Sequence, residues 1–381
     1  MKNKIGTYLL SFFLQPTLTT CYCTYRWWEK ESRLIIVLFT ILVGYAAEPI
    51  RDTMDLHYYL TNFIYGYKKE PLDFYLTYLR EIVISFTNNS HIFLAVAGLV
   101  LGIFVSKSLK RFTKTHNSLL GFILVFIFLC SFNFYMLGGI RFVTAFYVFF
   151  YGVSSYIETK KKKYILILSL SALVHYTYVL GIIIFFTSLI IKKFSKVLKY
   201  LVVLSFLFSL LPPSFSYDII FSLLLKISGF YQQGIEFYAN VEGAQNLIEA
   251  TSKAKWYTLY AQDFLEYTIL VVTVILYRKR KFLHIDSKIR SLIIFTSLFF
   301  IFINIFQYVP HLGLRFSKIY IAFAIYSLYH LFRVNQYFPN FKYYIASIGV
   351  SAFFYIAVSL LNNIEIFPLV NVFKPLFVYF I

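Results

Sequence analysis

Long apolar runs separated by short charged segments occupy most of the chain. The runs do not alternate apolar and polar residues, so the pattern disfavours a transmembrane barrel and predicts helices. A helix needs roughly 20 residues to cross the hydrocarbon core, and several runs approach that length. We predict an all-α multi-pass membrane protein with about ten spans, near residues 5–25, 34–48, 91–106, 118–137, 140–157, 199–212, 257–277, 291–308, 316–332 and 343–361.

The segment 164–191 departs from this regular pattern. It is apolar except around His175, and basic residues flank it on both sides. A single crossing would place one basic flank on the wrong side of the membrane. Two short helices that turn near His175 satisfy both flanks, so we favour a half-membrane helical hairpin with a polar tip over one tilted span.

Two further segments are predicted to lie at the outer face of a single membrane domain, residues 1–381. The first outer loop, 49–90, contains both acidic and basic residues. The large outer loop, 213–256, has the composition of a soluble protein and is expected to form short amphipathic helices, a cap or lid.

Composition and charge decide the environment and the orientation. The chain is 59% hydrophobic and 14% charged, which a soluble domain cannot bury. Six loops (26–33, 107–117, 158–163, 192–199, 278–290 and 333–342) hold 23 of the 36 Lys and Arg but four of the 17 Asp and Glu, and so carry the whole net charge of +19. Basic loops face the cytoplasm, so topology explains the charge better than a nucleic acid partner does. Both termini are then predicted to face outward.

Two arginines are candidates for binding an anionic substrate group. Arg141 follows Gly138-Gly139-Ile140 and Arg315 follows Gly313-Leu314, each at the predicted outer start of a span. A guanidinium cannot lose its proton and offers a planar fork of donors, which suits a phosphate or diphosphate. The alternative is that each arginine reaches outward to the lipid headgroups. Lys318, one turn after Arg315, is open to the same two interpretations.

Asp55 and His175 are the candidate general bases. Asp55 shares a predicted helix face with Tyr59, four residues later, and can take a proton from a sugar hydroxyl or pair with Arg51. His175 at the predicted hairpin tip is either a general base or phosphate ligand, or a buried structural residue. We expect Arg51 to contribute to diphosphate binding and Tyr59 to contact glycan.

Three other residues are weaker candidates for glycan binding. Asp263 and Glu266 lie three residues apart near the outer end of one predicted span, and they could also form an acid–base pair or a cation site. His311 lies four residues before Arg315. The sequence contains no phosphate-binding loop, dinucleotide-binding glycine motif, nucleophile elbow or His-Glu-x-x-His motif. We expect no cofactor and no metal.

Three short motifs follow one another along the first half of the chain. They are Arg51-Asp52-x-x-Asp55-x-x-x-Tyr59, Gly138-Gly139-Ile140-Arg141-Phe142-x-x-Ala145, and Ala172-Leu173-Val174-His175-Tyr176-Thr177 after a lysine-rich turn.

In these motifs the chain resembles the EpsG family of Wzy-type polysaccharide polymerases, over about residues 30 to 360. The resemblance implies a GT-C-like helical bundle in the bacterial cytoplasmic membrane. It also implies a glycosyltransferase that joins oligosaccharide repeat units carried on undecaprenyl diphosphate at the outer face, making O antigen, capsule or exopolysaccharide. Expected partners are the lipid-linked glycan, membrane lipid and a chain-length regulator. The alternatives are an O-antigen ligase, which uses the same donor, and a lipid-linked oligosaccharide flippase.

Overall fold

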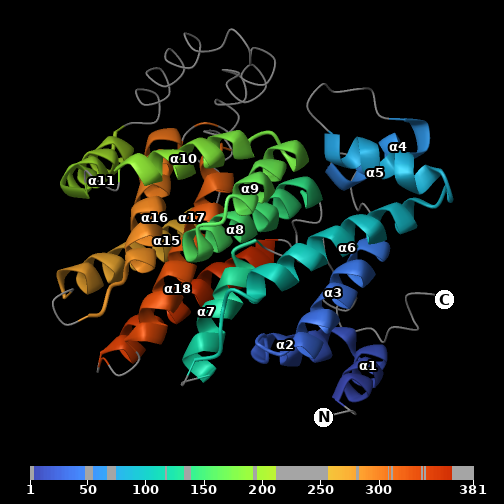
Figure 1. Ribbon diagram of the computed structural model, residues 1–381, viewed down its shortest axis with the longest axis horizontal. Helices are drawn as coiled ribbons and strands as arrows, with labels where there is room; N and C mark the ends of the chain where they lie inside the picture. Colours follow the sequence, from blue (N-terminus) through green and yellow to red (C-terminus); the bar gives the residue numbers. More distant parts are fainter. Residues whose placement is uncertain are drawn as a thin grey trace, which may run out of the picture. The chain divides into compact units, whose positions relative to one another are not determined.

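The structure, a computed structural model, is built from helices (Figure 1), and no strand occurs in the described residues. Helices satisfy their backbone hydrogen bonds internally, as a chain in lipid must. The described residues are 4–47, 55–66, 74–115, 118–132, 139–191, 195–211, 256–279, 283–307, 309, 312–335, 338 and 340–362.

The chain divides into two compact units: unit 1 comprises Met1–Ile183 with Leu360–Ile381, and unit 2 comprises Ile184–Ser359. The helices of unit 1 are α1 (Lys4–Leu14), α2 (Pro16–Tyr25), α3 (Lys30–Tyr45), α4 (Asp55–Tyr65), α5 (Phe74–Ile84), α6 (Ser90–Leu109), α7 (Ser118–Cys130), α8 (Ile140–Thr159) and α9 (Lys163–Val174). Helix α10 (Tyr178–Ile191) crosses the division, and unit 2 contains α11 (Ser195–Ser209), α15 (Trp256–Arg278), α16 (Ser287–Phe306), α17 (Leu312–Val334) and most of α18 (Phe341–Asn362).

Each predicted span coincides with at least one helix. Within the described ranges, five helical segments are by length and composition able to cross a membrane: Ser90–Leu109, Ile140–Thr159, Tyr260–Arg278, Ser287–Phe306 and Phe341–Ser359. These findings agree with an all-α membrane protein, whereas the number of spans and the GT-C-like bundle stay predictions. The large outer loop lies outside the described residues, apart from Trp256 at the start of α15.

The predicted first span, 5–25, is not a single helix. It is broken between Leu14 and Pro16, where α1 ends and α2 begins. Proline has no N–H and its ring blocks the preceding helical turn, but it fits the first position of a new helix. With 11 and 10 residues, α1 and α2 are each about 15 Å long, roughly half the hydrocarbon thickness.

Helix α1 folds back along α2 and returns the start of the chain to a basic loop. The Lys4 amine lies 3.5 Å from the Glu29 carboxylate, to which the Tyr8 hydroxyl donates a hydrogen bond of 3.0 Å. The rings of Tyr8 and Tyr22 meet edge to face. This corrects the prediction that the N-terminus faces outward, because Lys4 lies at the same end as the basic loop.

The three basic loops of unit 1 meet at one end, as the charge pattern predicts. The Trp27 indole donates to the Phe112 carbonyl over 2.7 Å, joining the first loop to the second. Arg111 then forms a 2.8 Å ion pair with Glu158, joining the second loop to the third. Because these residues are far apart in sequence, their contacts independently support a common side for the loops.

The long helices of unit 1 pack through glycines. Gly44 on α3 lies against the backbone of Leu94, and Gly98 on α6 lies against the backbone of Thr40. A Cβ atom at either glycine would overlap that backbone, so the close α3–α6 crossing in Figure 1 needs glycine there. Small residues at helix crossings are how membrane helices gain dispersion contacts without a hydrophobic driving force.

Unit 2 is organised around α17, which packs against α16 and α15 and is buried along most of its length. At one end, Asn335 accepts a hydrogen bond from the His284 N–H and donates one to the His284 carbonyl. Nearby, the Lys279 amine donates to the Tyr344 hydroxyl over 3.0 Å. Two basic loops predicted to share the cytoplasmic side are thereby joined.

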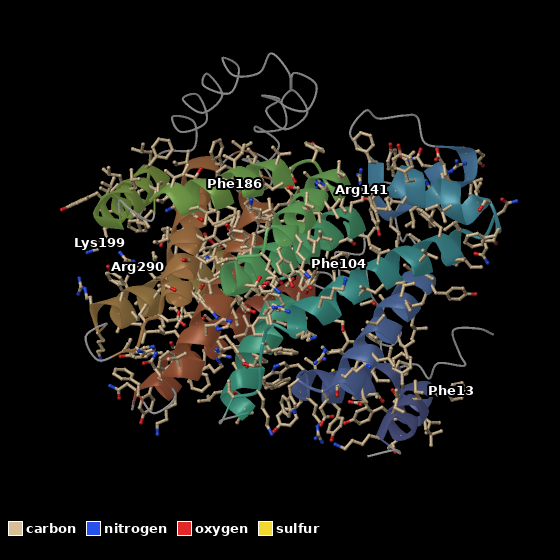
Figure 2. The ribbon with its side chains drawn as sticks, viewed as in Figure 1. Phe13, Phe104, Arg141, Phe186, Lys199 and Arg290 are labelled. Atoms are coloured by element: carbon tan, nitrogen blue, oxygen red, sulfur yellow. The ribbon has the colours of Figure 1, made fainter. Side chains whose placement is uncertain are left out.

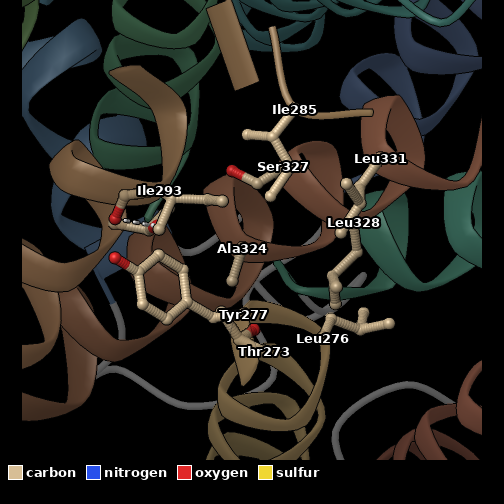
Figure 3. Close-up of a pocket in the computed structure, with 10 residues that line it drawn as sticks. Thr273, Leu276, Tyr277, Ile285, Ile293, Ala324, Ser327, Leu328 and Leu331 are labelled. Carbon is tan, nitrogen blue, oxygen red and sulfur yellow. Dashed lines mark hydrogen bonds between the residues drawn. The ribbon is translucent and has the colours of Figure 1, made fainter. Parts of the chain in front are cut away.

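A small, mainly apolar cavity lies among α15, α16 and α17 (Figure 3). Thr273, Tyr277 and Ser327 line it together with Ile285 and Leu331, near the same basic loops. No candidate site residue contributes to its wall, so it does not add to the predicted chemistry of unit 2.

Candidate functional site

The first turn of α8 places Arg141 at the end of unit 1 opposite the basic loops. Helix α8 begins after Gly139, which provides no side-chain cap, and Glu158 of the basic end lies near the other terminus. Seventeen residues separate Arg141 from Glu158, or roughly 26 Å along a helix. The uncapped backbone N–H groups and the guanidinium therefore concentrate positive potential at the same end.

Tyr59 of α4 holds this arginine. The Arg141 Nε atom donates to the Tyr59 hydroxyl over 3.1 Å, and its guanidinium carbon lies 5.1 Å from the centre of the same ring. A hydrogen bond and a cation–π contact from one side chain fix both the position and the tilt of the guanidinium. Tyr59 is neutral, so this contact is not an ion pair. Figure 2 labels Arg141 between α8 and the α4–α5 pair.

Tyr59 is itself fixed by the packing of α4. It is 1% exposed and lies in a hydrophobic cluster with Phe63 and Phe93, whose rings stack. The helix ends at Gly66, whose φ of +93° places it in the left-handed region that glycine adopts without strain. Arg80 of α5 donates from Nε to the Phe63 carbonyl over 2.9 Å, satisfying a C-terminal carbonyl of α4.

His175 lies at the turn where α9 ends and α10 begins. Its Nδ1 atom is 2.8 Å from the Thr177 hydroxyl, and its side chain is largely buried. The imidazole meets the Phe142 ring edge to face at 5.4 Å, and the Tyr178 hydroxyl donates to the Phe142 carbonyl over 3.1 Å. The turn at His175 therefore packs against Phe142, the residue that follows Arg141 in the first turn of α8.

The structure therefore gathers three predicted residues in unit 1 from distant parts of the sequence. We call Tyr59, Arg141, Phe142 and His175 the Arg141 cluster. Asp55 is the first residue of α4, so the four-residue spacing to Tyr59 is helical as expected, but the side chain of Asp55 lies outside the described part. Phe142 stands in one of the quoted motifs, but the sequence assigned it no role of its own.

Arg51 and His311 lie outside the described residues. Thr177, which stands in a quoted motif, and Arg80 were likewise given no role, although both help to build the site. The role of Thr177 could have been predicted, because it lies two residues after His175 in the predicted turn. No local pattern predicts that Arg80 binds the C-terminal end of α4.

The remaining candidates lie in unit 2. Glu266 is 6% exposed and accepts a 3.0 Å hydrogen bond from Gln262, and the buried Ser317 hydroxyl on α17 lies within reach of its carboxylate. Asp263 lies at the surface of the unit. The two carboxylates lie on one helix, but one is exposed and the other is buried. This difference weakens the hypothesis that they act as an acid–base pair.

Arg315 is half-buried near the start of α17, and Lys318 lies close enough for the two charges to repel. Arg315 belongs to unit 2 and Arg141 to unit 1. Among the described residues, no group of three or more His, Cys, Asp and Glu side chains is placed to hold a metal ion.

Comparison with known proteins supplies the family. The model of the EpsG family matches residues 32–371, nearly the whole length. The chain belongs to the EpsG family. This confirms the resemblance in the sequence, and because EpsG is a family of Wzy-like polymerases, membership indicates a membrane-bound polymerase of polysaccharide biosynthesis. No curated protein and no solved structure matches the chain.

Proposed function

We propose that this EpsG-family protein polymerises oligosaccharide repeat units carried on undecaprenyl diphosphate at the outer face of the bacterial cytoplasmic membrane. The observation that carries the proposal is the Arg141 cluster: a guanidinium held by a neutral tyrosine, beside a histidine turn, at the end of unit 1 away from the basic loops. Such a site can receive an anionic leaving group on the side where basic loops are scarce.

The proposed reaction is a substitution at the anomeric carbon of the donor glycan. The acceptor hydroxyl oxygen forms the new glycosidic bond, and the bond between that carbon and the diphosphate oxygen breaks with its electrons staying on the diphosphate. The hydroxyl proton passes to a base on the protein. Catalysis then depends on stabilising the diphosphate and on accepting one proton.

Arg141 stabilises the departing diphosphate in this proposal. The start of α8 adds backbone N–H groups to the same positive region, and a fixed guanidinium offers paired donors to phosphate oxygens. Arg315 and Arg51 are proposed as further diphosphate ligands. The arginines would supply the positive charge that other transferases take from a metal ion, so we propose that the reaction is metal-independent.

His175 and Asp55 remain alternative bases. If His175 is the base, its Nδ1–H donates to the Thr177 hydroxyl, so that Nε2 is the atom that accepts the proton. If Asp55 is the base, the α4 helix carries it four residues before Tyr59, close to the Arg141 cluster. Tyr59, Asp263, Glu266 and His311 are proposed glycan contacts, and a chain-length regulator is a proposed partner.

The decisive experiment uses the purified protein in liposomes with one synthetic lipid-linked repeat unit as both donor and acceptor. We expect products longer than one unit and release of undecaprenyl diphosphate. Transfer of a single glycan to a lipid A–core acceptor, without chain growth, would instead identify a ligase. Movement of intact units across the bilayer without bond formation would identify a flippase.

Two variants in the same assay identify the base. Asp55→Asn and His175→Gln each remove a proton acceptor while largely keeping size. We expect one of them to lower the rate by about 10²–10⁴-fold, the usual contribution of a general base, and the other to have a smaller effect. Equal, small effects from both would contradict the assignment of the base to this cluster.

The outer location needs a separate test in cells. A reporter that is active in the cytoplasm, fused after residue 160, should give signal because this position lies at the basic end. The same reporter fused after residue 86, at the opposite end, should not. The reverse pattern would place the Arg141 cluster in the cytoplasm and contradict the proposal.

A further inference from the structure

Helix α5 exposes an apolar row that its packing does not require. Phe74, Tyr78 and Ile82 are 43%, 59% and 59% exposed. They follow one another at intervals of four residues, so they share one face of the helix. The Phe74 and Tyr78 rings stack with 12° between their planes, which makes the row a continuous surface.

The opposite face of α5 already holds the helix in unit 1. Leu76 and Val83 are fully buried in the cluster that also contains Tyr59, and Leu79 lies between them. A short helix on a soluble protein normally carries polar residues on the face that points away from the core. Helix α5 carries phenyl, phenol and branched aliphatic groups on that face, which indicates that the face contacts another apolar surface.

The place of α5 in unit 1 restricts what that surface can be. The helix precedes the start of α6, at the end that holds the Arg141 cluster and away from the basic loops (Figure 1). It also packs against α9, which exposes its own row of Leu166, Leu170 and Leu173. In a membrane protein a leucine row of this kind faces lipid, so α5 packs against a helix that faces lipid.

We propose that α5 is an interfacial helix whose Phe74–Tyr78–Ile82 row lies in the boundary between headgroups and acyl chains of the outer leaflet. Aromatic side chains concentrate at that depth, because they combine an apolar ring with a polar edge. Glu81 lies three residues after Tyr78, at the edge of this row, and its exposed side chain is long enough to extend from there to the headgroups.

This position would set the depth of the Arg141 cluster, a consequence that rests on the proposed function. Arg80 of α5 bonds to the end of α4, and α4 carries Tyr59 against Arg141. An anchored α5 therefore holds the guanidinium near the level of lipid phosphates. A lipid-linked diphosphate presents its charge at that level without leaving the membrane.

Spin labels in liposomes test the anchor without measuring any activity. A Cys21→Ser background removes the exposed native cysteine, while Cys23 and Cys130 are buried. Nitroxides are placed at Tyr78→Cys and Ile82→Cys, with Glu81→Cys as the matched control on the same helix. Relaxation by oxygen, which enters the bilayer, is compared with relaxation by a water-soluble nickel chelate.

We expect positions 78 and 82 to favour oxygen over the chelate, with a depth just below the phosphates, and position 81, at the edge of the row, to be relaxed more by the chelate than either of them. Strong relaxation by the chelate at 78 and 82 would overturn the proposal. So would spectral broadening that disappears on dilution with unlabelled protein, because the row would then cover a second copy. Since no turnover is measured, failure here is distinguishable from failure of the polymerase assignment.

Discussion

Arg141 and Arg315 are similar in sequence and differ in their surroundings. Each follows a glycine by two residues near the start of a long helix. Arg141 contacts the ring and the hydroxyl of one tyrosine. Arg315 instead has a second cation, Lys318, one helical turn later, and the two positive charges repel each other. The first arrangement fixes the direction of a guanidinium, and the second accumulates charge.

The difference shows that the surroundings of an arginine, and not only its position at the start of a span, determine what it can bind. A fixed planar fork recognises phosphate by geometry, while two neighbouring cations attract an anion mainly through charge. An anion beside Arg315 and Lys318 would also relieve their repulsion. We therefore expect the two sites to respond differently when arginine is exchanged for lysine.

Of the changes that test this comparison, removing either guanidinium should have the largest effect. We expect Arg141→Ala and Arg315→Ala to lower polymerisation by about 10²–10³-fold, as losing one donor to a developing anion does elsewhere. Glycan length on gels, with protein level measured alongside, checks this. Arg111→Ala, which breaks the Glu158 ion pair at the basic end, is the matched control and should leave chain length unchanged.

Exchanging arginine for lysine should separate the two sites. Arg141→Lys keeps the charge but loses the fork and the ordered contact with Tyr59, so we expect roughly a tenfold loss. Arg315→Lys should keep most of the activity if charge is what matters there. Equal losses in both variants, measured as initial rates in liposomes, would remove the distinction between the sites.

A smaller effect is expected from Tyr59→Phe. This change removes the hydroxyl that accepts from Arg141 Nε and keeps the ring for the cation–π contact. Losing one hydrogen bond of about 1 kcal/mol predicts a loss of roughly three- to tenfold in rate. Tyr58→Phe, on the neighbouring residue, is the control; an equal loss there would show that the tyrosine hydroxyls act through the fold of α4.

The smallest effect should come from a residue outside both sites. Partial burial raises the pKa of Glu29, but the hydrogen bond from Tyr8 and the charges of Arg26 and Lys4 outweigh it, so the pKa lies below its usual range. A lowered pKa means that Glu29 stabilises the fold above the pKa of an unfolded glutamate and that this stabilisation is lost as the pH falls through the folded value.

Glu29→Gln should therefore lower thermal stability at neutral pH by about 1 kcal/mol or less, since Lys4 is solvent-exposed. It should also remove this part of the acid sensitivity and leave polymerisation unchanged. Melting curves of the purified protein between neutral and acidic pH measure both effects. A loss of polymerisation would link the N-terminal hairpin to the catalytic site.

Sequence alone was sufficient where one local property decides the outcome. Apolar runs of near-spanning length predict the helices, and clustered Lys and Arg predict which loops meet. Each follows from the cost of exposing polar backbone or charge to lipid, which residues carry regardless of their distant neighbours.

Tertiary structure decided everything that depends on which distant surfaces meet. Local pattern does not reveal that Tyr59 contacts Arg141 across 82 positions, or that Asp263 is exposed while Glu266 is buried. The return of α1 to Glu29 likewise needed a partner for Lys4 and Tyr8. In lipid all apolar helix faces are nearly equivalent, so specific packing and a few polar contacts choose among them, and those choices exist in three dimensions only.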